Sequence, residues 1–187
     1  MHSYICGLFF FGGSIVNNLL NFFDKLELQQ LEKSDSYTKA EKIVERLFEG
    51  KTDKGGNPYL NHLYYVSNHL EEINMKIVGL LHDLLEDTII TADDLKEVGF
   101  NSKIIEALLL ITKMDDESYE DYINRVLDSN NLTAINVKKV DMEHNMDLSR
   151  ITNPTSRDYK RLEKKYKPQY KKITNYLKEE ENKYDRY

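Results

Sequence analysis

The sequence predicts an all-α fold, a helical bundle, and three observations lead to this prediction. Apolar residues recur at intervals of three and four over most of the chain, and no segment shows the strict alternation of a half-buried strand. Eight glycines and three prolines in 187 residues are too few for many short strands and tight turns. A hydrophobic content of 40% with 31% charged residues is typical of a folded domain with a sizeable core.

Local signals place the helices. Thr38 and Glu41 fit a capping box, so a helix is expected to begin there and to close at Gly50. Residues 51–58, KTDKGGNP, form a loop. Pro168 is expected to kink or break the last helix, because a mid-helix proline removes a hydrogen bond. Thr91 is expected to cap a short helix that ends at Gly99, and Ser118 is expected to start a helix over 118–129. The other later helices are expected over residues 61–73, 75–86, 102–113, 131–150 and 155–180.

One domain is expected over residues 34–178, with an N-terminal extension of unknown role at 1–33 and a polar tail at 179–187. Residues 4–16 are apolar, but a helix that spans a bilayer needs about 20 such residues. We therefore expect no stable membrane insertion; the alternatives are an extension that packs on the domain and a weakly membrane-associating segment. The single cysteine, Cys6, cannot form an internal disulfide, so nothing indicates secretion and a cytoplasmic location is expected.

Charge is unevenly distributed along the chain. The net charge of −6 argues against non-specific nucleic-acid binding, which a basic protein favours. Residues 157–172 nevertheless carry eight Lys/Arg and only two Asp/Glu. Such a segment is either a solvated helix face or a surface that faces a polyanionic ligand.

The most informative segment is residues 77–88, IVGLLHDLLEDT. On a helix, its four leucines share one arc, and His82, Asp83, Glu86 and Asp87 share the opposite arc. No Lys or Arg neutralises the three carboxylates, which repel one another unless a cation lies among them. The pattern therefore favours a metal site.

Further ligands are needed to complete such a site. His62 lies on the preceding helix and Asp141 on the long helix, in VKKVDMEHNMDLSR. Together with His82 and Asp83 they would supply two nitrogens and two carboxylates from three helices. This mixture suits Mn²⁺, Fe²⁺, Co²⁺ or Zn²⁺ better than Ca²⁺. Taken singly, His62 and Asp141 read as surface or hydrogen-bonded residues, and only the joint pattern makes them ligands.

The segments NPYLNH, GLLHDLLEDT and VKKVDMEHNMDLSR resemble the signatures of HD-domain phosphohydrolases. More narrowly, they resemble the hydrolase domain of the RelA/SpoT group and its small alarmone hydrolases, over residues 36–178. The resemblance implies the HD-domain helical bundle. It also implies one divalent metal ion, most often Mn²⁺, on His62, His82, Asp83 and Asp141, and it makes Glu86 and Asp87 the acidic pair that orients or deprotonates water.

The same resemblance supplies residues for binding a phosphorylated nucleotide. They are Lys51, Lys54, Lys138, Asn145 and Arg150. RelA/SpoT hydrolases commonly carry an arginine in the loop before the first motif, and this loop offers only lysines. An ammonium lacks the planar stacking face of guanidinium, so this departure bears on base selectivity more than on hydrolysis.

Three functions remain open at this point. The first is a metal-dependent (p)ppGpp 3′-pyrophosphohydrolase, which gives GDP or GTP and pyrophosphate. The second is an HD phosphohydrolase for another phosphorylated nucleotide or metabolite, and the third is a non-catalytic HD-fold interaction module. The expected partner is a small nucleotide rather than a nucleic acid, and homo-oligomerisation is left open. His144, three residues after Asp141, either supports the metal ligands or is a packing residue, and His69 is expected to be a surface or packing histidine.

Overall fold

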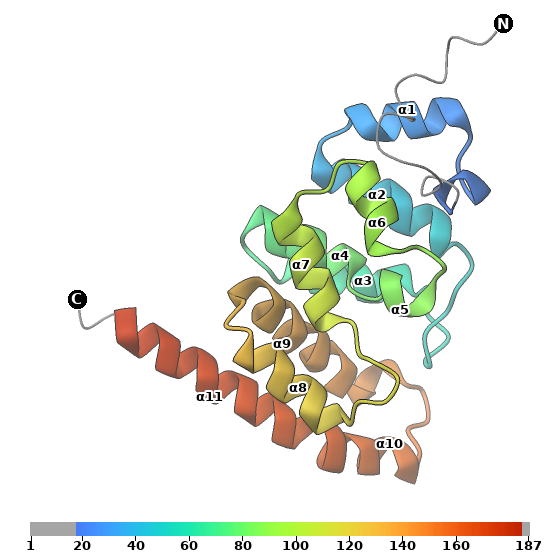
Figure 1. The fold of residues 1–187 in the computed structure, drawn as a ribbon. Helices are drawn as coiled ribbons and strands as arrows, with labels where there is room; N and C mark the ends of the chain where they lie inside the picture. The colour runs from blue at the N-terminus through green and yellow to red at the C-terminus, as the bar shows by residue number, and fades with distance from the viewer. Residues whose placement is uncertain (1–17, 185–187) are drawn as a thin grey trace, which may run out of the picture.

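The computed structural model describes residues 18–184, so the apolar run at 4–16 and Cys6 lie outside the described residues. The helices form an elongated stack with α1 at one end and α11 along the other (Figure 1). In chain order the elements are a 3₁₀ turn Leu19–Asn21, α1 (Lys25–Lys33), α2 (Ser36–Leu47), α3 (Leu60–Asn68), α4 (Ile73–Leu81), α5 (Leu84–Asp87), α6 (Ala92–Glu97), α7 (Ser102–Ile111), α8 (Tyr119–Asp128), α9 (Leu132–Met146), a 3₁₀ turn Leu148–Arg150, α10 (Ser156–Arg161), a π-helix Leu162–Tyr166 and α11 (Lys167–Tyr184).

The predicted all-α class is confirmed. Over residues 18–184 the sole β-type pairing is an isolated bridge between Thr52 and Pro58, in the loop between α2 and α3. Two predicted helix starts are also confirmed, because the side chains of Thr91 and Ser118 cap α6 and α8. None of the helices in this range is long and apolar enough to cross a membrane.

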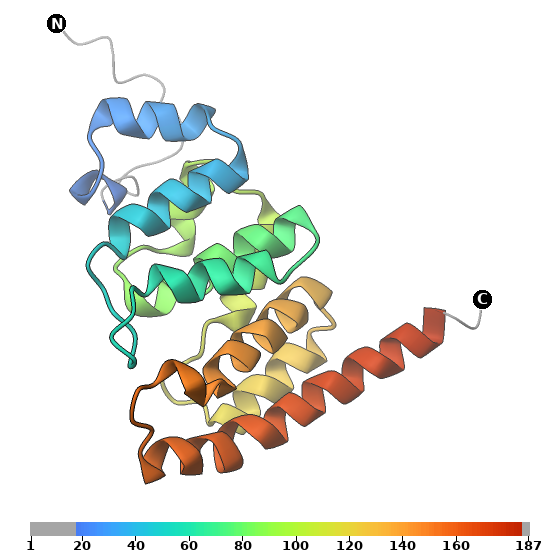
Figure 2. The same ribbon diagram turned by 180° about the vertical axis from the view of Figure 1, so that it is seen from behind.

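Helix α4 lies at the centre of the core. It packs against α3, α2, α9 and α7, and its side chains from Ile77 to Leu81 are buried. The backbone of α3 comes unusually near at Gly79, where a Cβ would lie 3.1 Å from Ser67 N and Cα. Figure 2 shows α3 and α4 side by side from behind. The missing side chain thus sets the close α3–α4 spacing.

Several helix boundaries differ from the predicted ones. Helix α2 is capped by Asp35, whose Oδ1 accepts the N–H of Thr38, so Thr38 lies within the first turn. The helix expected over 75–86 is interrupted at His82 and Asp83, between α4 and α5. The helix expected over 131–150 ends at Met146, and a 3₁₀ turn follows Asp147.

The region at 19–33 contributes to the core. Asp24 and Glu27 form a capping box that starts α1, a D-x-x-E signal that could have identified this helix from sequence. Leu28 and Leu31 are buried, and Arg46 of α2 bonds the carbonyl of Phe22 at 2.6 Å. Residues 19–33 therefore pack on α2 as part of the same body.

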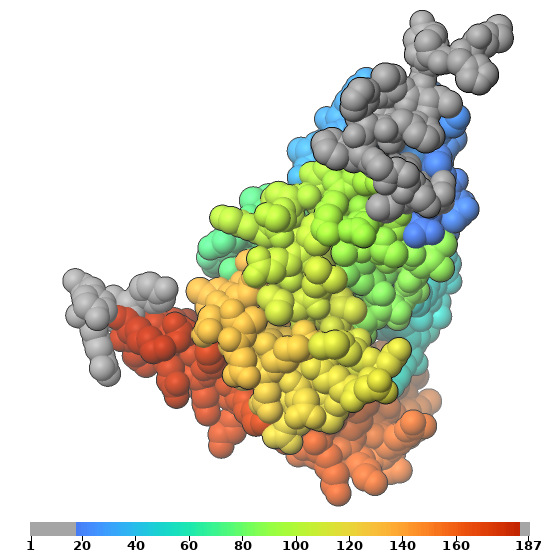
Figure 3. All heavy atoms as spheres, viewed as in Figure 1, coloured from blue at the N-terminus to red at the C-terminus, as the bar shows by residue number. Residues whose placement is uncertain are grey.

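The chain passes Pro168 without a break in helical structure. A π-turn at 162–166 precedes the proline, and the N–H of Lys167 bonds the carbonyl of Leu162, five residues earlier. Pro168 then follows closely on this π-turn, where the regular α-helical hydrogen-bond pattern is already interrupted. Helix α11 continues to Tyr184, past residue 178, and its C-terminal part projects from the body (Figure 3).

We predict that Leu28→Ala lowers the free energy of unfolding by about 2–5 kcal/mol, because it leaves a cavity under α1. Leu28 is 0% exposed, whereas Leu26 on the same helix is 63% exposed. The matched control Leu26→Ala should change the free energy by less than about 0.5 kcal/mol. Urea unfolding of both variants measures this, and equal stability of the two would show that α1 is not part of the cooperative core.

Candidate metal centre and substrate cavity

The fold brings the four predicted ligand residues together. His62 comes from α3, His82 and Asp83 from the turn between α4 and α5, and Asp141 from α9. His62 Nε2 lies 3.1 Å from His82 Nε2, and His82 Nε2 lies 3.1 Å from Asp83 Oδ2. Asp141 Oδ1 lies 3.3 Å from His62 Nε2 and 3.6 Å from His82 Nε2.

These donors are suited to a metal ion. One atom each from His62, His82 and Asp83 lies within 4.8 Å of the other two, which makes a group that could hold a metal. Both histidines and Asp141 are buried, with exposed fractions of 4–5%. Imidazole nitrogen mixed with carboxylate oxygen is the donor set that divalent transition metals prefer.

Local backbone structure orients His82. Its Nδ1 lies 2.7 Å from the carbonyl oxygen of Gly79, one turn earlier in α4. This contact places the proton on Nδ1 and leaves the lone pair of Nε2 available to a metal ion. The interruption after Leu81 places His82 and Asp83 in succession beside the centre, while Leu80 and Leu84 remain buried in the core.

A second set of side chains supports these four residues. His62 Nδ1 lies 2.6 Å from His144 Nδ1, and Tyr59 donates its hydroxyl proton to Asp83 Oδ2. Burial, the Arg150 guanidinium and His62 lower the pKa of His144 to about 4, so this imidazole is neutral at neutral pH. Partners of this kind fix the orientation of metal-binding histidines.

Two predicted substrate-binding residues contact Asp141. Lys138 Nζ lies 2.8 Å from Asp141 Oδ2, and Asn145 Nδ2 lies 2.5 Å from Asp141 Oδ1. Burial opposes the charge on Asp141, but the Lys138 ammonium and the two nearby imidazoles keep its pKa well below the usual range. Lys138 and Asn145 therefore hold Asp141 ionised and oriented. Asn145 also lines the cavity described below.

The acidic pair lies on the short helix α5. Glu86 Oε1 accepts the backbone N–H of Lys113 at 2.6 Å, and burial of its carboxyl, with the nearby charges of Asp83 and Asp87, raises the pKa of Glu86. Asp87 forms an ion pair with Lys51 at 2.7 Å. The charge of Lys51 is therefore paired with Asp87, a member of the acidic pair.

A cavity of about 260 Å³ opens beside the centre. The ligand residue His62 lines it, together with Tyr59 and Asn145, which contact Asp83 and Asp141. Its wall also carries Lys54 and Arg150, which were predicted to bind substrate. Arg150 is held by Asp53 at 2.9 Å, which joins the loop between α2 and α3 to the 3₁₀ turn after α9. A larger open hollow between α1 and α2 contains none of the four ligand residues.

Sequence reasoning did not identify Arg161 and Tyr166 as cavity residues, although both line it. The available signal was the basic segment at 157–172, which the sequence alone left open between a solvated face and a ligand-facing surface. The structure places only some of its members at the cavity.

Comparison with known proteins identifies the relatives of the chain. It is 28% identical over 128 residues to the GTP pyrophosphokinase of Myxococcus xanthus, which covers 60% of the chain and 17% of that relative. It is 34% identical over 85 residues to the guanosine-3′,5′-bis(diphosphate) 3′-pyrophosphohydrolase of Borreliella burgdorferi, which covers 43% of the chain and 13% of that relative. It is 27% identical over 111 residues to the bifunctional (p)ppGpp synthase/hydrolase SpoT of Escherichia coli K12, covering 52% and 16%.

These relatives are RelA/SpoT hydrolases and synthetases, so the resemblance seen in the three motifs is confirmed. The chain spans less than a fifth of the length of each of them. No protein-family model matches the chain.

We predict that His144→Ala weakens metal binding by roughly 10- to 100-fold, because the His62 ring loses the partner that orients it. The matched control is His69→Ala, since His69 is exposed and its imidazole contacts the carbonyl and the ring of Tyr65. Titration of the purified variants with Mn²⁺ gives the affinities. Equal affinity of the two variants would remove His144 from the support of the centre.

Proposed function

We propose that the chain is a metal-dependent (p)ppGpp 3′-pyrophosphohydrolase. The observation that carries the proposal is the group of two histidines and two aspartates, three of them buried, next to a cavity whose wall carries Lys54, Arg150 and Arg161 beside two aspartates. The names of several relatives, among them the Borreliella burgdorferi protein, support this substrate and this reaction.

We propose His62, His82, Asp83 and Asp141 as the ligands of one divalent ion, with Mn²⁺ as its identity. When bound, such an ion makes a water molecule more acidic and neutralises phosphate charge. The donor set fits Mn²⁺, and the buried Lys138–Asp141 ion pair keeps one carboxylate ionised for this role.

The reaction requires a base for water. Water attacks the phosphorus attached to the 3′-oxygen, the 3′-O–P bond breaks, and the 3′-oxygen takes up a proton, so that GDP or GTP and pyrophosphate result. Glu86 is our candidate base, because its raised pKa brings it nearer to neutral pH, and Asp87 orients it or the water. Lys51 positions Asp87 through their ion pair.

The cavity would hold the nucleotide. Lys54, Arg150 and Arg161 carry the positive charge that binds phosphates, and Asn145 and Tyr59 lie between them and the ligand residues. A small nucleotide inside the cell is thus the proposed partner, and a cytoplasmic location fits it.

A second candidate substrate is another phosphorylated nucleotide or metabolite. The observation that favours it is the loop over residues 51–58, which contains no arginine and whose Lys51 is taken up by Asp87. The base of the nucleotide would then be selected less strictly than the phosphates.

Turnover of guanosine 3′,5′-bispyrophosphate by the Mn²⁺-loaded protein tests the proposal directly. We expect GDP and pyrophosphate in equal amounts, resolved by anion exchange, and loss of both with EDTA and in Asp83→Ala. Asp93→Ala is the control, because Asp93 is exposed and pairs with Lys96 three residues later on the same helix. A metal-loaded protein that leaves this substrate intact but hydrolyses another nucleotide would establish the second candidate instead.

We further predict that Glu86→Gln retains Mn²⁺ and lowers kcat by roughly 10²- to 10⁴-fold, the usual contribution of a general base. In the unsubstituted protein, kcat/KM should rise with pH through the raised pKa of Glu86, since only the ionised carboxylate accepts a proton. The variant should lose this acidic limb. The control is Glu106→Gln on the exposed side of α7, and near-normal turnover of Glu86→Gln would exclude Glu86 as the base.

A further inference from the structure

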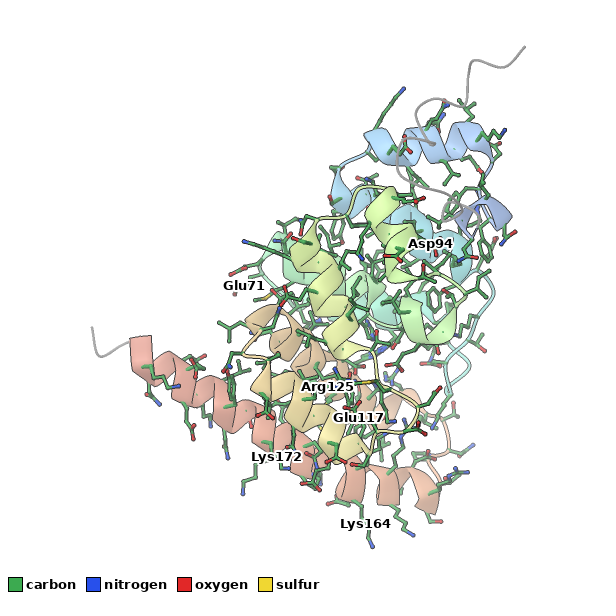
Figure 4. All side chains as sticks on the ribbon, in the orientation of Figure 1. Glu71, Asp94, Glu117, Arg125, Lys164 and Lys172 are labelled. Carbon is green, nitrogen blue, oxygen red and sulfur yellow. The ribbon has the colours of Figure 1, made fainter. Side chains whose placement is uncertain are left out.

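The basic segment at 157–172 divides into outward and inward cations. Lys167 pairs with Glu163, and Lys172 pairs with Glu120 of α8 at 2.6 Å. Lys164 is exposed and points away from the body (Figure 4). Lys165, its neighbour in the π-turn, is partly buried, so the segment is not simply a solvated face.

Lys165 lies among aromatic rings and other cations. Its Nζ is 4.1 Å from the ring centroid of Tyr119 and 5.5 Å from that of Tyr166. It has no carboxylate partner among residues 18–184. Burial, followed by the charges of Arg161, Lys138 and Lys113, lowers the pKa of Lys165 to about 8. A partly buried ammonium without a counter-ion is costly unless an anion reaches it.

Tyr119 contributes a second unsatisfied group. Its hydroxyl oxygen is buried and has no hydrogen-bond partner within the described part of the chain. Burial raises the pKa of this hydroxyl, so it remains a proton donor at neutral pH. The ring is fixed by Tyr122 and Tyr166, each with its centroid 5.9 Å away. A buried donor left unpaired is unfavourable, and a bound acceptor would satisfy it.

These two groups adjoin the proposed catalytic centre. Lys138 Nζ lies 5.9 Å from the Tyr119 ring centroid and is the group that pairs with Asp141. Tyr166, the other ring beside Lys165, lines the substrate cavity. The π-turn itself is a local irregularity of the kind found often at functional sites.

We propose that Lys165 and the Tyr119 hydroxyl form a subsite for the diphosphate group that leaves during hydrolysis. This inference rests on the proposed function. A diphosphate carries several charges and many acceptor oxygens, so one ligand supplies both the counter-ion of Lys165 and the missing acceptor of Tyr119. As the 3′-O–P bond breaks, the oxygen from water becomes part of the departing pyrophosphate, and the ammonium of Lys165 stabilises its charge.

The test is the affinity of the Mn²⁺-loaded full chain for pyrophosphate and, separately, for GDP, both measured by isothermal titration calorimetry. Lys165→Met and Tyr119→Phe should each weaken pyrophosphate binding, by roughly 10-fold for the charged contact. Binding of GDP should change less than about 2-fold. The matched control Lys164→Met removes the same charge from the solvent side of the same turn and should leave both affinities unchanged.

Two further measurements separate binding from folding. Lys165→Arg restores the charge and should restore most of the pyrophosphate affinity, which a purely structural effect would not require. In turnover assays, inhibition by added pyrophosphate should weaken in Lys165→Met by the same factor as its direct binding.

The outcomes are distinct. Equal pyrophosphate affinity of Lys165→Met and Lys164→Met would overturn the subsite, and a loss confined to GDP would overturn its assignment to the leaving group. Because pyrophosphate binding needs no turnover, a protein that binds it through Lys165 but leaves guanosine 3′,5′-bispyrophosphate intact would contradict the proposed substrate and retain an anion subsite.

Discussion

The packing of α4 between α3 and α9 is the constraint on which the rest of the site depends. His62, the His82–Asp83 turn and Asp141 belong to these three helices, and their donor atoms lie 3.1–3.6 Å apart. Such distances are kept only if the helix axes cannot slide. The absent side chain at Gly79 permits the backbone of α3 to come close, and the buried residues of α4 fill the space toward the other helices.

Charge inside the core is arranged around one carboxylate. Asp141 is buried, and a buried carboxylate is unfavourable unless it is paired and hydrogen-bonded. Lys138 supplies the opposite charge, and Asn145 and the two imidazoles supply the remaining contacts. Fold stability alone does not explain why these charged groups are buried, because apolar residues of similar volume would fill the same space. The arrangement is instead suited to binding a cation.

The cationic residues separate into three kinds of contact. Lys138 and Lys51 each pair with an acid of the centre, Arg150 joins two loops through Asp53, and Lys165 has no acidic partner among the described residues. The first kind holds Asp141 and Asp87 in place, and the second shapes the cavity. The last is available for an anion that comes from solution.

The helices were predictable where capping and periodicity act locally. Thr91 and Ser118 cap α6 and α8 as the sequence indicates, since a cap involves residues two or three apart. The break at His82–Asp83 and the π-turn before Pro168 were not predictable. Both depend on how neighbouring helices pack against the segment, and periodicity alone continues an ideal helix through them.

The sequence by itself determined the helical class, the three motifs and the residue types able to bind a metal, because periodicity and donor chemistry are properties of short segments. The contacts of Lys138 and Asn145 with Asp141 are local, because these residues lie three and four positions away from it on α9. Only the tertiary structure decided that Lys51 pairs with Asp87, and that Arg161 and Lys165 turn inward while Lys164 and Lys172 do not. The Lys51–Asp87 pair joins a loop and a helix that are far apart in the sequence. Which of two neighbouring lysines turns inward depends on the face of the helix that packs against the body.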